Sequence, residues 1–179
     1  MNTTLEIDDL AAQLRFHTIE RDAFLQASVR LTCQSVNCSR TGLWTFVGSD
    51  HRRSLQCLAM YDRSSDTMVR VAERHEDGAG PYFDELLRRG HVMAHDARTH
   101  CATRGFFESD LRPRGVRSLM AASFALNGRL YGALTCTQLG VPVHWTPLQL
   151  GVLMRLGARI SLALASASPH QLDTFFGPL

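Results

Sequence analysis

The sequence predicts an α/β fold of the α+β type, with a central antiparallel sheet of five or six strands. Three observations carry this prediction: strand-like runs between residues 40 and 73, two long apolar runs joined by Asn127-Gly128, and helical periodicity at both ends. We expect the terminal helices to cover one face of the sheet and a polar, aromatic segment to form a ligand pocket on the other. At 179 residues the chain has room for about one domain.

The N-terminal third is expected to hold one helix and three strands. Asp8 or Asp9 can cap a helix that continues through Phe16 and Ile19 to about Leu31, with apolar residues three and four apart. Strand-like runs follow at 40–48 and 55–61, and residues 67–73 alternate as an exposed edge strand does. We divide the chain into an N-terminal helical and dimerisation segment (1–35), a main domain with the C-terminal helix (36–167) and a linker or tail (168–179).

The middle of the chain predicts a helix and a hairpin. Pro81 stands at the first position of a helix over 81–90, and Gly90 stands just past its end. The apolar runs 116–126 and 130–139 are typical of strands buried on both faces, and Asn127-Gly128 between them is the strongest short-range signal for a hairpin.

A last helix, opened by Pro147 and running to about Ser166, is apolar around nearly its whole circumference. One side of this helix can pack on the sheet, and the other side needs a partner. We therefore expect a parallel, isologous homodimer built from the first and last helices, with Gly151 and Gly157 allowing close helix approach.

Composition excludes several classes of partner. The net charge is only +2 and no long basic run occurs, so we expect no nucleic-acid partner. Five cysteines, with no secretory leader before them, argue against a disulfide framework. No apolar run approaches the ~20 residues that cross a bilayer, so we expect a cytoplasmic protein without a membrane partner.

The stretch between the helix and the hairpin is too polar for a core and too aromatic for an idle loop. Segments of this kind commonly line a cavity, and we expect this one to fold over the sheet and enclose a small-molecule site. The candidate ligand-binding residues comprise apolar walls and polar groups that would orient the ligand: Tyr82, Phe83, Phe106, Phe107, Leu111 and Met120 as walls, and His95, Asp96, Arg112, Ser118 and Thr135 as polar groups.

A family resemblance runs through Pro81-Tyr82-Phe83, His95-Asp96-Ala97, Leu111-Arg112-Pro113-Arg114-Gly115, Asn127-Gly128 and Trp145-Thr146. Together these residues resemble the second half of a GAF domain, and the similarity, over about residues 20–167, is closest to GAF domains placed before diguanylate cyclase or histidine kinase modules. The resemblance implies a non-catalytic sensory domain. Such a domain would bind a small effector, or sense redox state, and signal through its terminal helices to an output module.

The resemblance does not name the effector. The Asn-Lys-x-x-x-Phe-x-x-x-Asp-Glu pattern of GAF domains that bind cyclic nucleotides is absent, since the chain has no lysine. Bilin-binding members carry a Cys followed by His, whereas here the order is His100-Cys101. Gln138 replaces the usual acidic residue of the last strand, and Met-Ala-Ala-Ser-Phe follows Leu119 where Asp-Ala-Pro is more common.

Other chemistry has partial support in the sequence. Cys33 and Cys38, with His91, His95, His100 and Cys101, are ligand types that zinc accepts, but their scattered spacing does not predict a metal site. Haem would need an axial ligand in an apolar niche, and these histidines have polar neighbours. No Gly-x-Ser-x-Gly elbow occurs, and we predict no catalytic residue. Two alternatives remain: a dimerisation module with a vestigial pocket, and a thiol enzyme like free methionine sulfoxide reductase that uses Cys101 beside His100 and Arg104.

Overall fold

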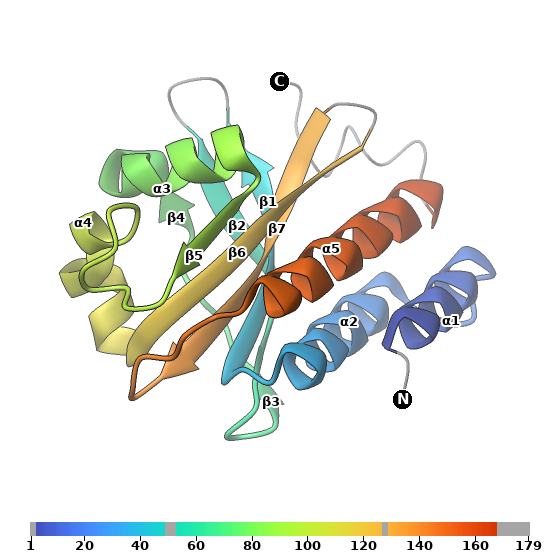
Figure 1. Ribbon diagram of the computed structural model, residues 1–179. Helices are drawn as coiled ribbons and strands as arrows, with labels where there is room; N and C mark the ends of the chain where they lie inside the picture. The colour runs from blue at the N-terminus through green and yellow to red at the C-terminus, as the bar shows by residue number, and fades with distance from the viewer. Residues whose placement is uncertain (1–2, 49–52, 127–128, 168–179) are drawn as a thin grey trace.

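A seven-stranded antiparallel sheet separates two layers of helices in the computed structural model (Figure 1). The structure describes residues 3–48, 53–126 and 129–167. In chain order the elements are α1 (Thr3–Arg15), α2 (Arg21–Val36), β1 (Arg40–Val47), β2 (Ser54–Asp62), β3 (Thr67–Met68), β4 (Arg74–His75), α3 (Glu76–Arg89), β5 (His91–Ala94), α4 (Arg104–Phe106), the π-helix η1 (Phe107–Leu111), the 3-10 helix η2 (Arg112–Arg114), β6 (Val116–Leu126), β7 (Arg129–Leu139) and α5 (Pro147–Ala167).

The sheet has the strand order β3-β2-β1-β7-β6-β5, and the short β4 also pairs with β2. All pairings are antiparallel. The predicted hairpin is confirmed, because β6 pairs with β7 from Val116 opposite Leu139 to Leu126 opposite Arg129. Its Asn127-Gly128 turn and the expected tail, 168–179, lie outside the described residues. The predicted antiparallel α+β architecture is therefore confirmed.

Each face of the sheet carries its own core, as alternation along the strands requires. We call the core beneath α1, α2 and α5 the helix-side core, and the core beneath α3 and the residues that follow β5 the lid-side core. On β6, Met120, Ala122 and Phe124 belong to the helix-side core, whereas Leu119 and Ala121 belong to the lid-side core. Figure 1 shows the two layers on opposite sides of the strands.

The last helix, α5, packs on the sheet and on α1. Its first turn is fixed by a reciprocal capping box, in which the Gln149 amide donates to Oγ1 of Thr146 (3.2 Å) and the Thr146 amide donates to Oε1 of Gln149 (2.9 Å). Gly157 lies against Phe124, to which a Cβ at this position would come within 3.5 Å. The expectation that this glycine serves contact with a second helix is thus wrong, because it faces the sheet.

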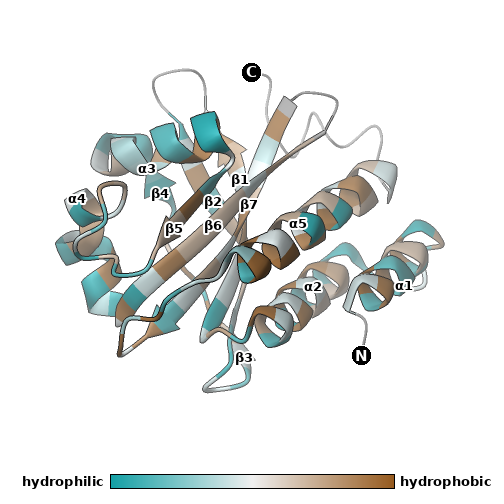
Figure 2. Cartoon of the chain, in the orientation of Figure 1, coloured by the Kyte–Doolittle hydropathy of each residue, from teal (hydrophilic) through white to brown (hydrophobic). Residues whose placement is uncertain are grey.

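By length and composition alone, Pro147–Ser166 would also suit a membrane span, contrary to the expectation that no apolar run is long enough. Leu153, Leu156 and Ile160 nevertheless pack into the helix-side core. Figure 2 shows hydrophobic residues distributed along α5. A core helix of this kind passes the same test of length and composition, so the finding is weak support for a membrane location.

The N-terminal helix differs from its prediction. One continuous helix to about Leu31 was expected, but the chain breaks between α1 and α2, where His17 adopts a left-handed conformation with φ of 56°. The amide of Thr18 closes the break by donating to the Gln13 carbonyl (2.9 Å). Phe16 is 72% exposed at this corner, although the periodicity placed it in the core. The break folds α1 back so that it covers α5.

Two further differences concern the sheet near the pocket. The expected edge strand 67–73 is a strand only at Thr67–Met68, because the chain then leaves β2 and re-enters the sheet at Arg74. The strand β5 was not predicted, since four residues directly after a helix carry too little alternation. It nevertheless pairs with β6 from His91 opposite Ala122 to Ala94 opposite Leu119.

Candidate functional site

Residues 95–115, here called the lid, cover the sheet opposite the terminal helices, together with α3. A turn opens the lid, in which the Arg98 amide donates to Oδ1 of Asp96 (3.0 Å). The Thr103 hydroxyl then donates to the Ala97 carbonyl (2.6 Å), which closes the loop before α4. At the other end Gly115 takes a left-handed conformation (φ 70°), where a side chain would be strained. The lid thus folds over the sheet as expected.

The space under the lid is packed with aromatic rings. Of the predicted walls, Tyr82 and Phe83 from α3 and Phe106, Phe107 and Leu111 from the lid are all buried. Tyr82 meets Phe83 and Phe106 edge to face, with ring centroids 6.0 and 5.6 Å apart. These five residues therefore share one core, whose centre is filled by side chains.

A buried arginine lies among these rings. The guanidinium of Arg74 lies 5.2 Å from the ring centroid of Trp44, 5.5 Å from that of Tyr82 and 5.1 Å from that of Phe106. Its Nε and Nη2 both donate to Oδ2 of Asp110, at 3.1 and 2.8 Å. The aromatic faces and the carboxylate together hold a cation that is only 8% exposed.

The floor of this core contains one predicted polar residue. Thr135 of β7 accepts a hydrogen bond from Nε1 of Trp44 (2.9 Å) and donates to the Gly42 carbonyl (3.3 Å). Gly42 is required here, because a Cβ would come within 2.6 Å of the Trp44 indole nitrogen. Thr135 therefore orients the indole that packs against Arg74.

The Tyr82 hydroxyl is buried close to the guanidinium of Arg74, without a well-aligned hydrogen bond to any residue that the structure describes. Burial raises the pKa of Tyr82, and the charge of Arg74 and its interaction with the hydroxyl oppose that shift. The hydroxyl therefore belongs to the polar surroundings of Arg74.

An open cavity of about 340 Å³ adjoins the lid-side core at the edge of the sheet. We call it the arginine cavity, because four arginines line it between the chain that leaves β3 and the end of the lid. The lining residues are Arg40, Met60, Val69, Arg70, Val71, Arg74, Leu111, Pro113, Arg114 and Val116. Of the predicted site residues, only Leu111 lines this cavity.

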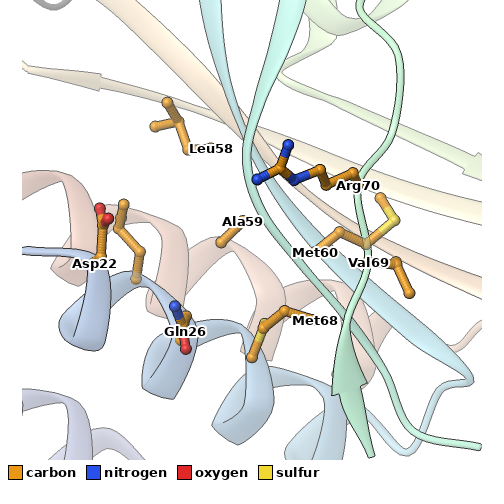
Figure 3. A pocket seen from close by; sticks show the side chains of 9 residues that line it. Asp22, Gln26, Leu58, Ala59, Met60, Met68, Val69 and Arg70 are labelled. Atoms are coloured by element: carbon orange, nitrogen blue, oxygen red, sulfur yellow. The ribbon is translucent and has the colours of Figure 1, made fainter. Parts of the chain in front are cut away.

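A second cavity, of about 320 Å³, lies on the other side of the segment that carries Val69 and Arg70. Figure 3 shows that Asp22 and Gln26 approach it from α2, while Met68 and Arg70 approach it from the strand side. Met60, Val69 and Arg70 line both cavities. The segment after β3 therefore forms the wall between a helix-side and a lid-side opening.

Two predicted site residues of β6, Met120 and Ser118, face away from the lid-side core. Met120 packs in the helix-side core, because it alternates with Leu119 and Ala121 on β6. Ser118 accepts a hydrogen bond from the Val143 amide (2.8 Å) and donates to the His95 carbonyl. The expectation that Met120 and Ser118 line the pocket is therefore wrong, because alternation along β6 places both on the helix side of the sheet.

His95 likewise joins the lid to the connection before α5. Its Nδ1 accepts a hydrogen bond from the Trp145 amide (3.0 Å), and its ring centroid lies 3.8 Å from that of His144. Burial lowers the pKa of His95, and the charges of His144 and His100 lower it further. The ring is therefore favoured in its neutral form, which can accept the Trp145 amide.

The two remaining predicted polar residues stabilise the lid itself. Asp96 caps the first turn of the lid and lies 3.8 Å from Nη2 of Arg117. Arg112 is exposed and pairs with Glu108 one turn away (2.5 Å). Neither side chain lines one of the cavities described above.

The cysteines divide between the two sides. Cys33 and Cys38 lie in the helix-side core with their sulfurs 3.7 Å apart. The hydrogen bond between them and burial raise the pKa of Cys33, and a hydrogen bond with Cys136 and burial raise that of Cys38. Burial raises the pKa of Cys57 to about 11. These thiols are thus poor nucleophiles at neutral pH.

Cys101 is exposed where the lid meets α3, and it lines a third opening of about 310 Å³ together with Glu85 and Arg88. Glu85, His100 and Cys101 place their ligand atoms within 4.8 Å of one another there. These are donor types that zinc accepts. Nδ1 of His100 already accepts the Ala102 amide (3.2 Å), so the neutral ring carries its proton on Nε2. A metal would have to displace that proton or that hydrogen bond, so the trio does not form a prepared site.

Sequence reasoning missed Trp44, Arg74, Asp110 and the other arginines of the cavity. Trp44 belongs to a strand that was predicted, but alternation alone does not say which face carries the site. Arg74 stands between two polar residues, Glu73 and His75, as a solvent-exposed arginine would. Only the departure of the chain from the sheet after Met68 turns Arg74 inward.

Many solved structures share the fold, among them the following three. The phycoerythrobilin-bound GAF domain from a cyanobacterial phytochrome aligns with a TM-score of 0.75 and 16% identity over 94% of this chain and 97% of its own. The Stigmatella aurantiaca phytochrome photosensory core module aligns with a TM-score of 0.67 and 12% identity over 96% of this chain and 37% of its own. The GAF domain from Acinetobacter phosphoenolpyruvate-protein phosphotransferase aligns with a TM-score of 0.65 and 14% identity over 95% and 97%.

At these identities the likeness to solved structures shows the fold alone, and no curated protein matches the chain in sequence. The sequence itself carries the family. The family model described as "GAF domain" matches residues 20–164, most of the chain, and the protein therefore belongs to the GAF domain family.

Proposed function

We propose that this GAF domain is a non-catalytic sensor that binds a small effector in the arginine cavity. The observation that carries the proposal is the cavity of about 340 Å³ between the lid and the sheet edge, which the buried Arg74 helps to line. A solved relative holds phycoerythrobilin, which supports small-molecule binding by this fold. The effector of this cavity would be a different molecule from a bilin attached covalently at Cys101, because Cys101 is not among the residues that line the arginine cavity.

The signal would pass from the lid to α5 through His95 and Ser118. Both residues bond the connection that leads into α5, at Trp145 and Val143 respectively. An effector that binds one position of the lid more tightly than another would shift the population of lid positions. Because these bonds tie the lid to the start of α5, that shift would reposition the terminal helices.

The receiver of the signal would be an attached output module such as a diguanylate cyclase or a histidine kinase, in a cytoplasmic protein. A solved relative is part of a larger phytochrome module, which supports a place in a multidomain protein. The terminal helices would also form a homodimer, since α5 exposes Leu148 and Leu162. The low net charge supports the absence of a nucleic-acid partner.

Native mass spectrometry with an absorption spectrum tests the proposal. We expect protein purified from its own host to carry a small molecule that is lost in Val71→Trp, because a large side chain there would fill the cavity. Val141→Trp, on the exposed connection before α5, is the matched control and should retain the molecule. A bare wild-type mass, with no thermal shift on adding low-molecular-mass extract of that host, would contradict a sensory role.

The filled lid-side core favours one alternative, a dimerisation module with a vestigial pocket. That alternative predicts the same bare mass, together with a stable dimer. The other alternative is a thiol enzyme, for which only Cys101 is exposed among the five cysteines. Reduction of free methionine sulfoxide that disappears in Cys101→Ser would replace the sensory proposal with this activity.

A further inference from the structure

The arginine cavity holds more positive than negative charge. Arg74 and Arg114 both pair with a single carboxylate, that of Asp110, at 2.8 and 2.6 Å. Within the described part of the chain, Arg70 has no ion-pair partner. A guanidinium beside a partly enclosed cavity attracts an oxyanion more strongly than it would in open water.

The fourth arginine leaves this excess unchanged, because Arg40 is paired with Asp62 (2.5 Å). Arg40 also donates to the Arg114 carbonyl (3.1 Å), so it holds the end of the lid in place. The free binding capacity of the cavity therefore rests on Arg70 and on Arg114, which is 28% exposed. Both side chains are long enough to turn toward a ligand.

The remaining lining of the cavity is apolar. Met60 and Leu111 belong to the lid-side core, and Val71 packs against it from the segment after β3. A ligand that paired only with the arginines would leave the apolar lining exposed to water. A purely apolar ligand would leave the guanidinium groups without a partner. The lining therefore suits one molecule that carries both a negative charge and an apolar part.

Resting on the function proposed above, we propose that the effector is a small organic anion with an apolar body. Its oxyanion, a carboxylate, sulfonate or phosphate, pairs with Arg70 and Arg114, and its body lies against Val71, Met60 and Leu111. Asp110 already shows the geometry of such an interaction, since it is a carboxylate held by two guanidinium groups.

Two fluorescent probes separate charge from apolar binding. We use 8-anilinonaphthalene-1-sulfonate and its uncharged counterpart N-phenyl-1-naphthylamine, which has the same rings without the sulfonate. The folded wild-type protein should bind the sulfonate with 1:1 stoichiometry and at least about tenfold more tightly than the neutral probe, because one charge-assisted hydrogen bond is worth that much.

Single variants then assign the binding. Arg70→Gln and Arg114→Gln should each weaken sulfonate binding about tenfold and leave the neutral probe unaffected. Arg88→Gln, on the exposed side of α3 away from the cavity, is the matched control and should change neither. Arg70 is exposed and has no ion-pair partner among the described residues, so its replacement should not disturb folding, which thermal unfolding of each variant verifies.

The outcomes distinguish this inference from the proposed function. Equal affinity for the two probes, or sulfonate binding that both arginine variants leave intact, overturns the anion inference while a ligand-binding cavity stands. If wild-type protein binds neither probe, the anion inference is overturned. Whether the protein retains a small molecule in native mass spectrometry then tests the sensory role separately.

Discussion

At the scale of single residues, Arg74 is the side chain around which the lid closes. It is nearly buried, lies within 5.5 Å of three aromatic ring centroids and donates twice to Asp110. Such a cation is stable only with its partners in place, because the cost of desolvating a charge is large. Arg74 therefore couples β4 to α3 and to η1.

Replacing Arg74 tests this coupling. We expect Arg74→Ala to lower the free energy of unfolding by about 2–3 kcal/mol, below the usual cost of breaking a buried pair because Asp110 keeps Arg114 and is partly exposed. The free energy of unfolding of Arg74→Lys should lie between those of Arg74→Ala and the wild type, since lysine keeps the charge but lacks the planar, forked guanidinium. Urea denaturation gives these values. Arg88→Ala, on the exposed side of α3, should stay within about 0.5 kcal/mol of wild type, and a similar result for Arg74→Ala would contradict the role.

His95 predicts a pH dependence at the junction of the lid with α5. Its pKa is lowered in the folded protein by burial and by His144 and His100, so the unfolded chain binds the proton more readily. The stability from neutral His95 is therefore complete above about pH 6.5, the unfolded value, and is lost as pH falls toward the folded pKa. Protonation would also end its acceptance of the Trp145 amide.

The measurement is the thermal midpoint at pH 7.5 and pH 5.5. Wild-type protein should lose more stability over this interval than His95→Asn, whose side-chain oxygen can still accept the Trp145 amide but does not titrate. In a chain of this size each kcal/mol corresponds to about 2–4 °C. His91→Asn, at the start of β5, should behave as wild type. If the thermal midpoint of His95→Asn falls between pH 7.5 and pH 5.5 by as much as that of the wild type, other groups are responsible for the pH dependence.

At the scale of elements, the sequence predicted the regular parts of the fold well. Long runs such as 116–126 and a helix opened by Pro147 carry enough periodicity to determine their type. The break at Phe16-His17 was not predicted, because neither glycine nor proline marks it. His17 takes a left-handed conformation there, which a histidine adopts only with support from its surroundings. The strand β5 was not predicted either, because its pairing with β6, and not the pattern of its own four residues, makes it a strand.

The candidate site was predictable in its aromatic half and not in its charged half. Phe106 was found because aromatic residues in a loop need a core to cover them, and Tyr82 and Phe83 because they stand next to each other in a predicted helix that faces the sheet. Arg74 and Arg114 were not found, because the sequence does not show which of nineteen arginines the tertiary fold turns inward. Ser118 and Met120 were placed on the wrong face of β6, since a strand buried on both sides gives no alternation of polarity.

At the scale of the whole molecule, the sheet separates the lid-side core from the helix-side core. The junction at His95 and Ser118 lies where the lid ends meet the start of α5, so it links the two sides around the edge of the sheet. On the helix side α1 covers part of α5, and Arg159 pairs with Asp8 across that contact. The partner expected for α5 is therefore in part its own N-terminal helix.

The uncovered part of α5 still predicts a homodimer. Leu148 and Leu162 are 75% and 57% exposed, and Leu5 of α1 is 59% exposed. Leu148 and Leu162, 14 residues apart, lie near the same side of the helix, as a self-complementary contact between two copies requires. We expect light scattering to give twice the chain mass of 19.9 kDa.

Leu162→Asp should shift this dimer toward the monomer, because a charge would be buried in the contact without a partner. Val141→Asp is the matched control, since Val141 is 65% exposed on the connection before α5 and not on the helix. If both variants and the wild type are monomeric at high concentration, the exposed leucines are not a dimer surface, and the shift of α5 on effector binding would have to act within one chain.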